Sequence, residues 1–267
     1  MSQKMNRIIT GILVVLLCIV CITLFFTFQK DVDLNNPPVD ASDVPTKTFL
    51  TETPTPTATT LPSVLDAVDL LTWSYYQEIA LYNEYGDNQN GLIKKWTDEI
   101  KIYINELAAD SDLEVIYSHI ASLKLIQGMP DISMVDNVDA CNMRISFITQ
   151  SEMNTITQEN GEIAFGYTTI WWNQDADITR AEIYIVCDKQ EPIERKHTIL
   201  EELTQALGLM NDSDRYDDSI FYVHYSDSIL ELSQMDWDLV KIHYCNEIKP
   251  GMDYDEVNVL YSENKKR

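Results

Sequence analysis

The chain has 267 residues, of which 45% are hydrophobic, and its 43 acidic against 19 basic residues give a formal net charge of −24. A charge this negative repels phosphate groups, which excludes general binding of nucleic acid. The hydrophobic fraction excludes a disordered acidic tail, because such tails lack the apolar residues that build a core.

An uncharged run covers residues 8–28 and follows the two cations Lys4 and Arg7. About 20 apolar residues in a helix span the hydrocarbon core of a bilayer. The preceding cations predict a cytoplasmic stub at residues 1–7 and an extracytoplasmic remainder. A cleaved signal peptide is the weaker alternative, because the run is long and no small-residue cleavage site follows it. We therefore expect a single-pass protein of the cell membrane, anchored through residues 8–28.

Residues 29–63 are rich in proline and threonine and contain no glycine. Such a composition favours extended, polyproline-like geometry and cannot build a core. The stretch is therefore expected to be a linker that holds the following domain away from the membrane.

Residues 64–135 are expected to form a helical region. A first helix begins near Val64 after a capping Ser63, and a third runs over residues 112–127. Between them, apolar residues at helical spacing from Leu92 to Leu107 predict a second helix.

Residues 136–267 are expected to form the main domain. Apolar and polar residues alternate over 143–148, and further strands are expected at 164–173 and 181–187. Helices are expected at 193–209 and 234–244, the second with a capping box of Ser233 and Asp236. An order of helices, then a small sheet, then helices predicts an α+β fold.

The stretch 196–209 has an apolar side and a polar side when drawn as a helix. Its polar side carries His197, Glu201, Gln205 and Gly208, opposite apolar residues that include Leu203. An ordinary helix with one solvated face would explain this pattern without any functional site.

The same stretch resembles the active-site helix of metzincin-type zinc peptidases, which reads H-E-x-x-H-x-x-G-x-x-H. In that register Glu202 matches the general base and Gly208 the turn glycine. Glu201, Gln205 and Asn211 stand at the three positions where the family has zinc-binding histidines.

Flanking segments carry the resemblance further. Residues 218–221 resemble the Met-turn, with Phe221 at the methionine position, and residues 166–168 and 181–187 resemble the edge strand and its neighbour. Four motifs also resemble an uncharacterised group of bacterial envelope proteins: E-E-x-x-Q-x-L-G-L at 201–209, N-D-S at 211–213, S-I-F at 219–221 and K-P-G-M at 249–252. The resemblance implies a zincin-like domain with a small mixed sheet and an active-site-type helix.

The ligand chemistry departs from that of a zinc peptidase. Glu201, Gln205 and Asn211 or Asp212 form an all-oxygen set, which suits Ca²⁺ or Mg²⁺ better than Zn²⁺. We expect no cofactor, or else one of these divalent ions. Gln205 can instead donate a hydrogen bond to Glu201 one turn back, with His197 in the same row.

Two functions fit these residues. In the first, the cleft beside the helix binds a peptide or another envelope component without cleaving it. In the second, the protein is an atypical metal-dependent peptidase or hydrolase with Glu202 as general base.

The tryptophans are candidate binding residues, and the cysteines are candidates for a disulfide. Trp171 and Trp172 lie on the expected edge strand, where one ring faces the core and the other is a candidate recognition residue. Cys141, Cys187 and Cys245 either include one disulfide pair or are three separate thiols.

Overall fold

The computed structural model describes residues 63–82, 91–157, 164–224 and 228–266. The predicted anchor at residues 8–28 and almost all of the predicted linker lie outside the described residues. Within the described residues, no helix is both long and apolar enough to cross a bilayer.

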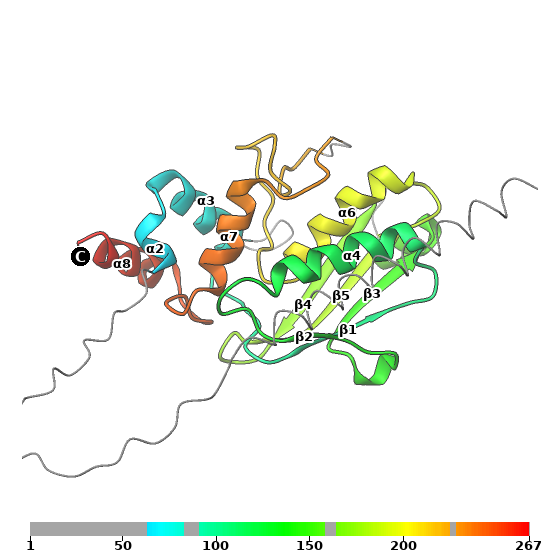
Figure 1. Cartoon of the computed structure of the whole chain (residues 1–267), viewed down its shortest axis with the longest axis horizontal. Helices are drawn as coiled ribbons and strands as arrows, with labels where there is room; N and C mark the ends of the chain where they lie inside the picture. The colour runs from blue at the N-terminus through cyan, green and yellow to red at the C-terminus, as the bar shows by residue number, and fades with distance from the viewer. Residues whose placement is uncertain (1–62, 83–90, 158–163, 225–227, 267) are drawn as a thin grey trace, which may run out of the picture. The chain divides into compact units, whose positions relative to one another are not determined.

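A five-stranded mixed sheet forms the centre of the fold (Figure 1). Its strand order is β2-β1-β3-β5-β4, with parallel pairing except between β4 and β5, which are antiparallel. β4 is therefore an edge strand. The strands are β1 Ile100–Ile104, β2 Ile132–Met134, β3 Met143–Ile148, β4 Gly166–Trp172 and β5 Ile178–Val186.

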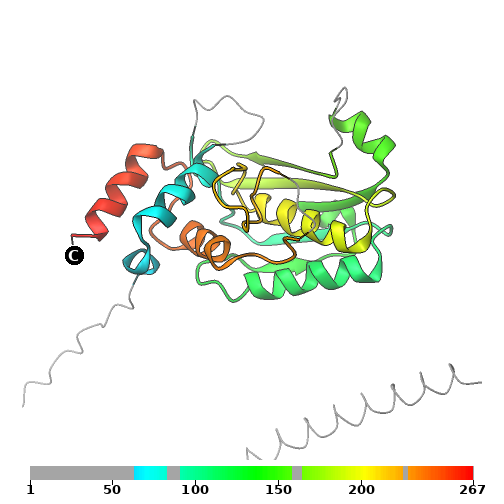
Figure 2. The same ribbon diagram turned by 90° about the horizontal axis from the view of Figure 1, so that it is seen from above.

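Two long helices, α4 and α6, cover the same face of the sheet, as both ribbon views show (Figures 1 and 2). Helices α2, α3, α7 and α8 gather at one end of the sheet. The helices are α2 Val64–Ala67, α3 Leu70–Leu81, α4 Asp110–Leu123, the short 3₁₀ helix η1 Val138–Ala140, α5 Gln150–Thr157, α6 Pro192–Gln205, α7 Gln234–Tyr244 and α8 Tyr254–Asn264.

Two buried polar contacts join α4 to α6. Arg195 Nε donates to Asp112 Oδ1 at 2.9 Å, and both side chains are buried. Farther along, Thr204 donates its hydroxyl hydrogen to the carbonyl of Leu200 at 2.6 Å. The Nε2 atom of His119, 3.2 Å from the same hydroxyl, must therefore be the donor in that contact. Burial lowers the pKa of His119 to about 4, so the ring is neutral.

The helical end is joined by aromatic packing and by one buried carboxylate. The rings of Trp73 in α3 and Tyr261 in α8 stack with centroids 4.6 Å apart. Asp236 of α7 is fully buried and accepts from the Ser219 hydroxyl at 2.6 Å. This carboxylate also closes the predicted capping box with Ser233. The loop that follows α6 is thereby attached to the start of α7.

Most elements of the main domain were predicted at nearly the observed positions. β3, β4, β5, α6 and α7 confirm the alternation and the helical periodicity described above, and α4 confirms the helix expected at 112–127. The first helix begins at Val64 as expected, but it is interrupted after Ala67 and resumes at Leu70.

The helix expected between Leu92 and Leu107 is wrong, because this segment contains β1. The spacing of its large apolar residues fits a helix, but Ile100, Ile102 and Ile104 alternate with other residues and are β-branched, which favours a strand between β2 and β3. Strands from both sides of residue 135 therefore lie in one sheet. The predicted order of helices, sheet and helices is replaced by a mixed α/β arrangement that also includes β2, α5 and α8.

Candidate functional site

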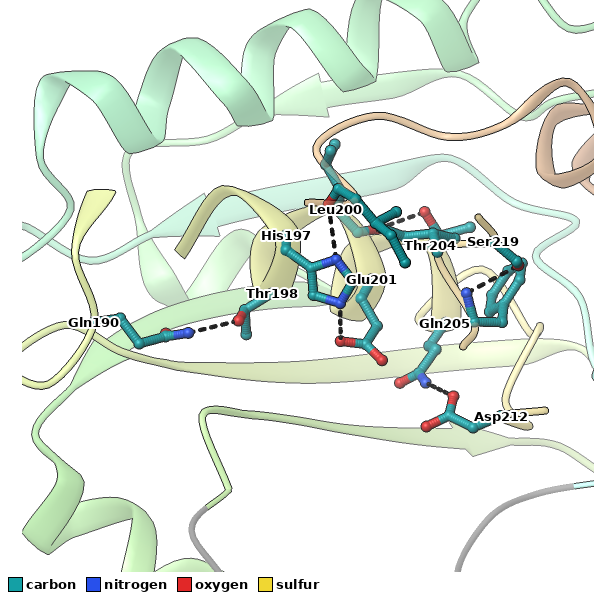
Figure 3. Close-up of polar contacts among 12 residues, drawn as sticks. Gln190, His197, Thr198, Leu200, Glu201, Thr204, Gln205, Asp212 and Ser219 are labelled. Atoms are coloured by element: carbon teal, nitrogen blue, oxygen red, sulfur yellow. Dashed lines mark hydrogen bonds and ion pairs between the residues drawn. The ribbon is translucent and has the colours of Figure 1, made fainter. Parts of the chain in front are cut away.

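A cleft of about 370 Å³ lies between helix α6 and the edge strand β4. The residues that line it come from α6, β4, the loop after α6 and the segment before β1. Figure 3 shows that the polar side chains of α6 in this region are held by contacts with their neighbours. The cleft that the edge-strand resemblance implied is therefore present.

The polar side of α6 is not an ordinary solvated face. Its opposite side packs into the core as expected, with Leu203 and Leu207 both buried. On the polar side, His197 is 1% exposed and Gln205 7% exposed. The loop after α6 and the chain near Ile229 cover these side chains, so the interpretation of α6 as a helix with one wet face is wrong.

His197 and Glu201 form an ion pair one helical turn apart. His197 Nε2 lies 3.4 Å from Glu201 Oε2, and His197 Nδ1 donates to the carbonyl of Ile229 at 2.8 Å. Burial by itself lowers the pKa of His197, but the Glu201 carboxylate and the Ile229 carbonyl stabilise the protonated ring more strongly, so the pKa is raised above its ordinary value. Glu201 is therefore directed at the imidazole of His197 within its own helix.

Gln205 does not donate to Glu201, contrary to the expected hydrogen bond along the helix. Its Nε2 atom donates instead to Asp212 Oδ1 at 2.8 Å (Figure 3). Asn211 donates from its side chain to the backbone carbonyl of Asp212 at 2.7 Å. The structure thus brings Gln205 and Asp212 together, while Glu201 is drawn towards His197.

Glu202 lies beneath the edge strand. Its side chain is 7% exposed, and a Cβ atom added to Gly166 of β4 would come within 2.2 Å of Glu202 Oε1. Thr168, also on β4, donates to the backbone carbonyl of Glu202 at 3.1 Å. Glycine at position 166 therefore allows β4 to approach α6 closely over this carboxylate.

Gly208 ends the α6 segment in the left-handed region, with φ +109°. A Cβ atom here would lie 1.9 Å from the backbone carbonyl oxygen of Lys94. That carbonyl accepts from Nε2 of His243 at 3.0 Å, and burial lowers the pKa of His243 to about 3. The glycine assigned from the metzincin register thus allows the chain after α6 to pack closely against the backbone of Lys94.

The Met-turn position is occupied by a buried aromatic side chain. Phe221 is fully buried, and its carbonyl accepts from the backbone N–H of Ser213 at 2.9 Å. This contact closes the loop that carries Asp212. Phe221 therefore belongs to the buried core next to this loop.

Neither tryptophan of β4 faces the core, which corrects the expected alternation. Trp171 is 41% exposed and Trp172 is 48% exposed. A register shift between these residues disrupts the regular alternation of the strand. Trp172 lines the cleft, whereas Trp171 lies against the guanidinium of Arg180, 4.8 Å from the ring centroid.

Sequence reasoning missed two residues of this region. Lys94 lines the cleft with its Nζ atom 4.8 Å from the centroid of the Trp172 ring. His243 holds the carbonyl of Lys94 from α7. Lys94 belongs to no motif, and both residues reach the site through tertiary packing, which the sequence pattern does not report.

A zinc centre does not fit this set of donors. Catalytic zinc usually takes three protein ligands from histidine, cysteine or carboxylate. Glu201 is paired with His197, while Gln205 and Asp212 are bonded to each other. Over the described ranges, no three His, Cys, Asp or Glu side chains are grouped as a metal ion would require. Carboxylate and amide oxygens suit Ca²⁺ or Mg²⁺, and binding of such an ion stays a prediction.

The three cysteines of the described residues are all free thiols. Cys245 is buried, whereas Cys141 and Cys187 are partly exposed. Of the two interpretations left open by the sequence, the structure has separate thiols.

A family model described as "Protein of unknown function (DUF2927)" matches residues 72–262. The chain belongs to this family. The matched part includes every strand of the sheet and all of α6, so the cleft lies within the DUF2927 region. No curated protein matches the chain in sequence.

Solved structures that resemble this chain include two of myroilysin and one of archaemetzincin from Methanopyrus kandleri. The myroilysin structures have TM-scores of 0.39 and 0.38 and are each 11% identical. They match 61% and 63% of this chain and 88% and 92% of their own chains. Archaemetzincin has a TM-score of 0.25 and 10% identity, with 64% of this chain and 97% of its own matched.

Proposed function

We propose that this protein is a membrane-anchored, extracytoplasmic binding protein whose cleft holds an extended peptide of the cell envelope without hydrolysing it. One observation carries the proposal. Glu201 and Gln205 stand where the metzincin-like helix would have zinc-binding histidines, and both are engaged in contacts within the protein. A cleft is present between α6 and β4, and these two side chains make contacts within the protein.

The edge of β4 supplies the means of binding. The carbonyl of Phe165, just before β4, accepts from Val186 N at 2.8 Å, which sets the hydrogen-bonding register with β5. Because inward and outward backbone groups alternate in an antiparallel pair, Gly166, Thr168 and Ile170 direct their N–H and C=O groups away from β5. An extended peptide can add to such an edge as a further strand.

The cleft has the size and composition of a site for a short peptide segment. Its volume of about 370 Å³ lies in the range of small-ligand pockets and accommodates a few side chains beside the added strand. Trp172 and Met210 provide apolar contact area, and Glu201 and Glu202 provide negative charge. We expect the backbone of the peptide to contribute affinity and these side chains to contribute selectivity.

Binding without hydrolysis follows from the positions of the carboxylates. In a zinc peptidase, a general base such as Glu202 acts on a water molecule that the metal has made acidic. The donor set described above does not fit zinc, and Glu202 lies buried against Gly166. We therefore propose that a peptide bound in this cleft is not hydrolysed.

Binding is tested with the full-length chain and a library of octapeptides labelled with fluorescein at the N-terminus and free at the C-terminus, measured by fluorescence anisotropy. A peptide that binds is then remade in two forms, N-methylated at its odd or at its even positions. Strand addition predicts that only one of the two forms loses binding, because only alternate peptide N–H groups point at the edge of β4. Equal loss from both forms, or no binding by any peptide, contradicts the proposal.

The location is tested separately in a bacterial host. Residues 8–28 and the linker at 29–63 support an anchor with the domain outside. The full-length chain is expected to stay with the membrane after carbonate extraction and to be digested by protease added outside spheroplasts. Extraction into the soluble fraction, or protection from the protease, contradicts the proposed location.

A further inference from the structure

Lys94 places a positive charge in a cleft that is also lined by the carboxylates Glu201 and Glu202 and by His197, which pairs with Glu201. Its side chain is partly buried, its Nζ atom lies 4.8 Å from the centroid of the Trp172 ring, and both residues line the cleft. Trp172 ends strand β4, so this pair marks one end of the peptide-binding edge. Glu202 and Gly166 lie towards the other end of the strand.

The backbone of Lys94 is held firmly in place. Its carbonyl oxygen accepts from His243 Nε2 at 3.0 Å and packs against the bare Cα of Gly208. His243 is neutral near pH 7, because burial lowers its pKa to about 3, and its Nδ1 atom is 3.2 Å from the Tyr76 hydroxyl. These buried contacts fix where the Lys94 side chain enters the cleft.

Among the described residues, no carboxylate lies within salt-bridge distance of Lys94 Nζ. The nearby carboxylates are directed elsewhere, with Glu201 towards His197 and Asp212 towards Gln205. Burial lowers the pKa of Lys94. An anion bound at this point would restore the interactions that the ammonium group lost with water.

The neighbouring Lys95 shows what a structural lysine looks like in the same segment. Lys95 is buried, and its Nζ atom donates to the carbonyls of Ile248 at 2.8 Å and Cys245 at 3.2 Å. Its donors are used within the fold. Lys94 differs from it, because its ammonium group is directed into the cleft.

We propose that Lys94, whose ammonium group lies over the Trp172 ring, binds a carboxylate of the peptide that occupies the cleft. The inference rests on the proposed function and adds the chemical class of the occupant. Two sources of the carboxylate are compatible with the edge of β4. In antiparallel addition the N-terminal part of the peptide lies beside Trp172, so the carboxylate belongs to an acidic side chain. In parallel addition it can be the terminal carboxylate.

The test uses the tightest-binding octapeptide from the library, with fluorescence anisotropy as the readout. It is remade with each acidic side chain changed to its amide, and separately with its C-terminus free or amidated. The structure predicts that neutralising one carboxylate weakens binding about tenfold, which corresponds to about 1.4 kcal/mol. Loss on changing a side chain identifies an acidic residue, whereas loss on amidation identifies the terminus.

Lys94→Met is the decisive variant, and Lys101→Met is its matched control. Lys101 lies in β1, is half-exposed and pairs with Glu99, the residue just before the strand. Lys94→Met should weaken the carboxylate peptide about tenfold and leave the neutralised peptide unchanged, whereas Lys94→Arg should retain most of the affinity. Lys101→Met should change neither affinity. Melting temperatures establish that the variants are folded.

The outcomes separate this inference from the proposed function. Peptide binding that is insensitive to Lys94→Met, or weakened equally for charged and neutralised peptides, overturns the inference and leaves the binding function standing. Absence of binding by every peptide in the library overturns both.

Discussion

Gln205 donates a hydrogen bond from its side-chain amide to Oδ1 of Asp212, across 2.8 Å. The contact joins the last residue of α6 to the loop that follows it, at the edge of the cleft. In the metzincin register, position 205 belongs to a zinc-binding histidine. Here the side chain at that position holds the wall of the cleft, which is a structural role.

This contact predicts a measurable loss of stability in Gln205→Ala. Because the hydrogen bond is largely buried, we expect the free energy of unfolding to fall by about 1–2 kcal/mol. Gln234→Ala is the matched control, since Gln234 makes the same kind of bond to Asp238 at 2.9 Å on the exposed surface of α7. The control should lose no more than about 0.5 kcal/mol. If urea denaturation shows that Gln205→Ala and Gln234→Ala lose the same free energy of unfolding, the Gln205 hydrogen bond stabilises the fold no more than an exposed one.

The His197–Glu201 pair predicts a dependence of stability on pH. The pKa of His197 is raised in the folded protein, so its contribution is full below the ordinary histidine pKa and is lost as pH rises through the folded value. Glu201→Gln should therefore cost about 1 kcal/mol more at about pH 5.5 than at about pH 9. Denaturation of both proteins at each pH measures the difference. If Glu201→Gln lowers the free energy of unfolding by the same amount at both pH values, the charged His197–Glu201 pair does not stabilise the fold.

The packing around Gly208 predicts that adding one methyl group there, in Gly208→Ala, lowers the stability of the protein strongly. Gly208→Ala combines a positive φ with a Cβ 1.9 Å from the Lys94 carbonyl, so we expect a loss of about 3 kcal/mol or more. Gly251→Ala is the control, because Gly251 also has a positive φ but its nearest neighbour would lie 3.4 Å away. That variant should lose about 1 kcal/mol from strain alone. If Gly208→Ala and Gly251→Ala lower the melting temperature by similar amounts, the close approach of the Lys94 carbonyl to Gly208 is contradicted.

The oxygen donors of the cleft predict that it does not bind zinc and that any metal ion bound there is Ca²⁺ or Mg²⁺. Elemental analysis of the full-length chain, purified without chelator, should show no stoichiometric zinc. If Ca²⁺ or Mg²⁺ binds through Gln205 and Asp212, EDTA should lower the melting temperature of the wild type and leave that of Gln205→Ala unchanged. One zinc per chain, removed by Glu201→Ala, would contradict the assignment of these residues to structural contacts.

The sequence contained enough to predict α6 and the strands beside it. The periodicity of residues 193–209 and the alternation in 143–148 report local geometry directly, and both are observed. The segment with β1 was predicted as a helix because its large apolar residues from Leu92 to Leu107 have helical spacing, although Ile100, Ile102 and Ile104 alternate as in a strand. Only the neighbouring strands, β2 and β3, decide between them.

The site was predictable as a region but not as a set of contacts. The motif at 201–209 located the cleft, and Gly208 occupies the turn position that the register suggested, whereas the role of Glu202 as general base stays a prediction. The partner of Gln205 depends on how the loop folds back, and Lys94 reaches the cleft from a segment more than a hundred residues away. Such contacts follow from tertiary packing, which leaves no periodic trace in the sequence.

The most direct test follows one peptide through binding and recovery. The full-length chain is incubated with an octapeptide that binds, and the peptide is then analysed by mass spectrometry, with Glu202→Gln as the matched protein. Binding without hydrolysis predicts that the peptide is recovered intact from both proteins. Cleavage by the wild type that disappears in Glu202→Gln would make the protein a hydrolase and would contradict the proposed function.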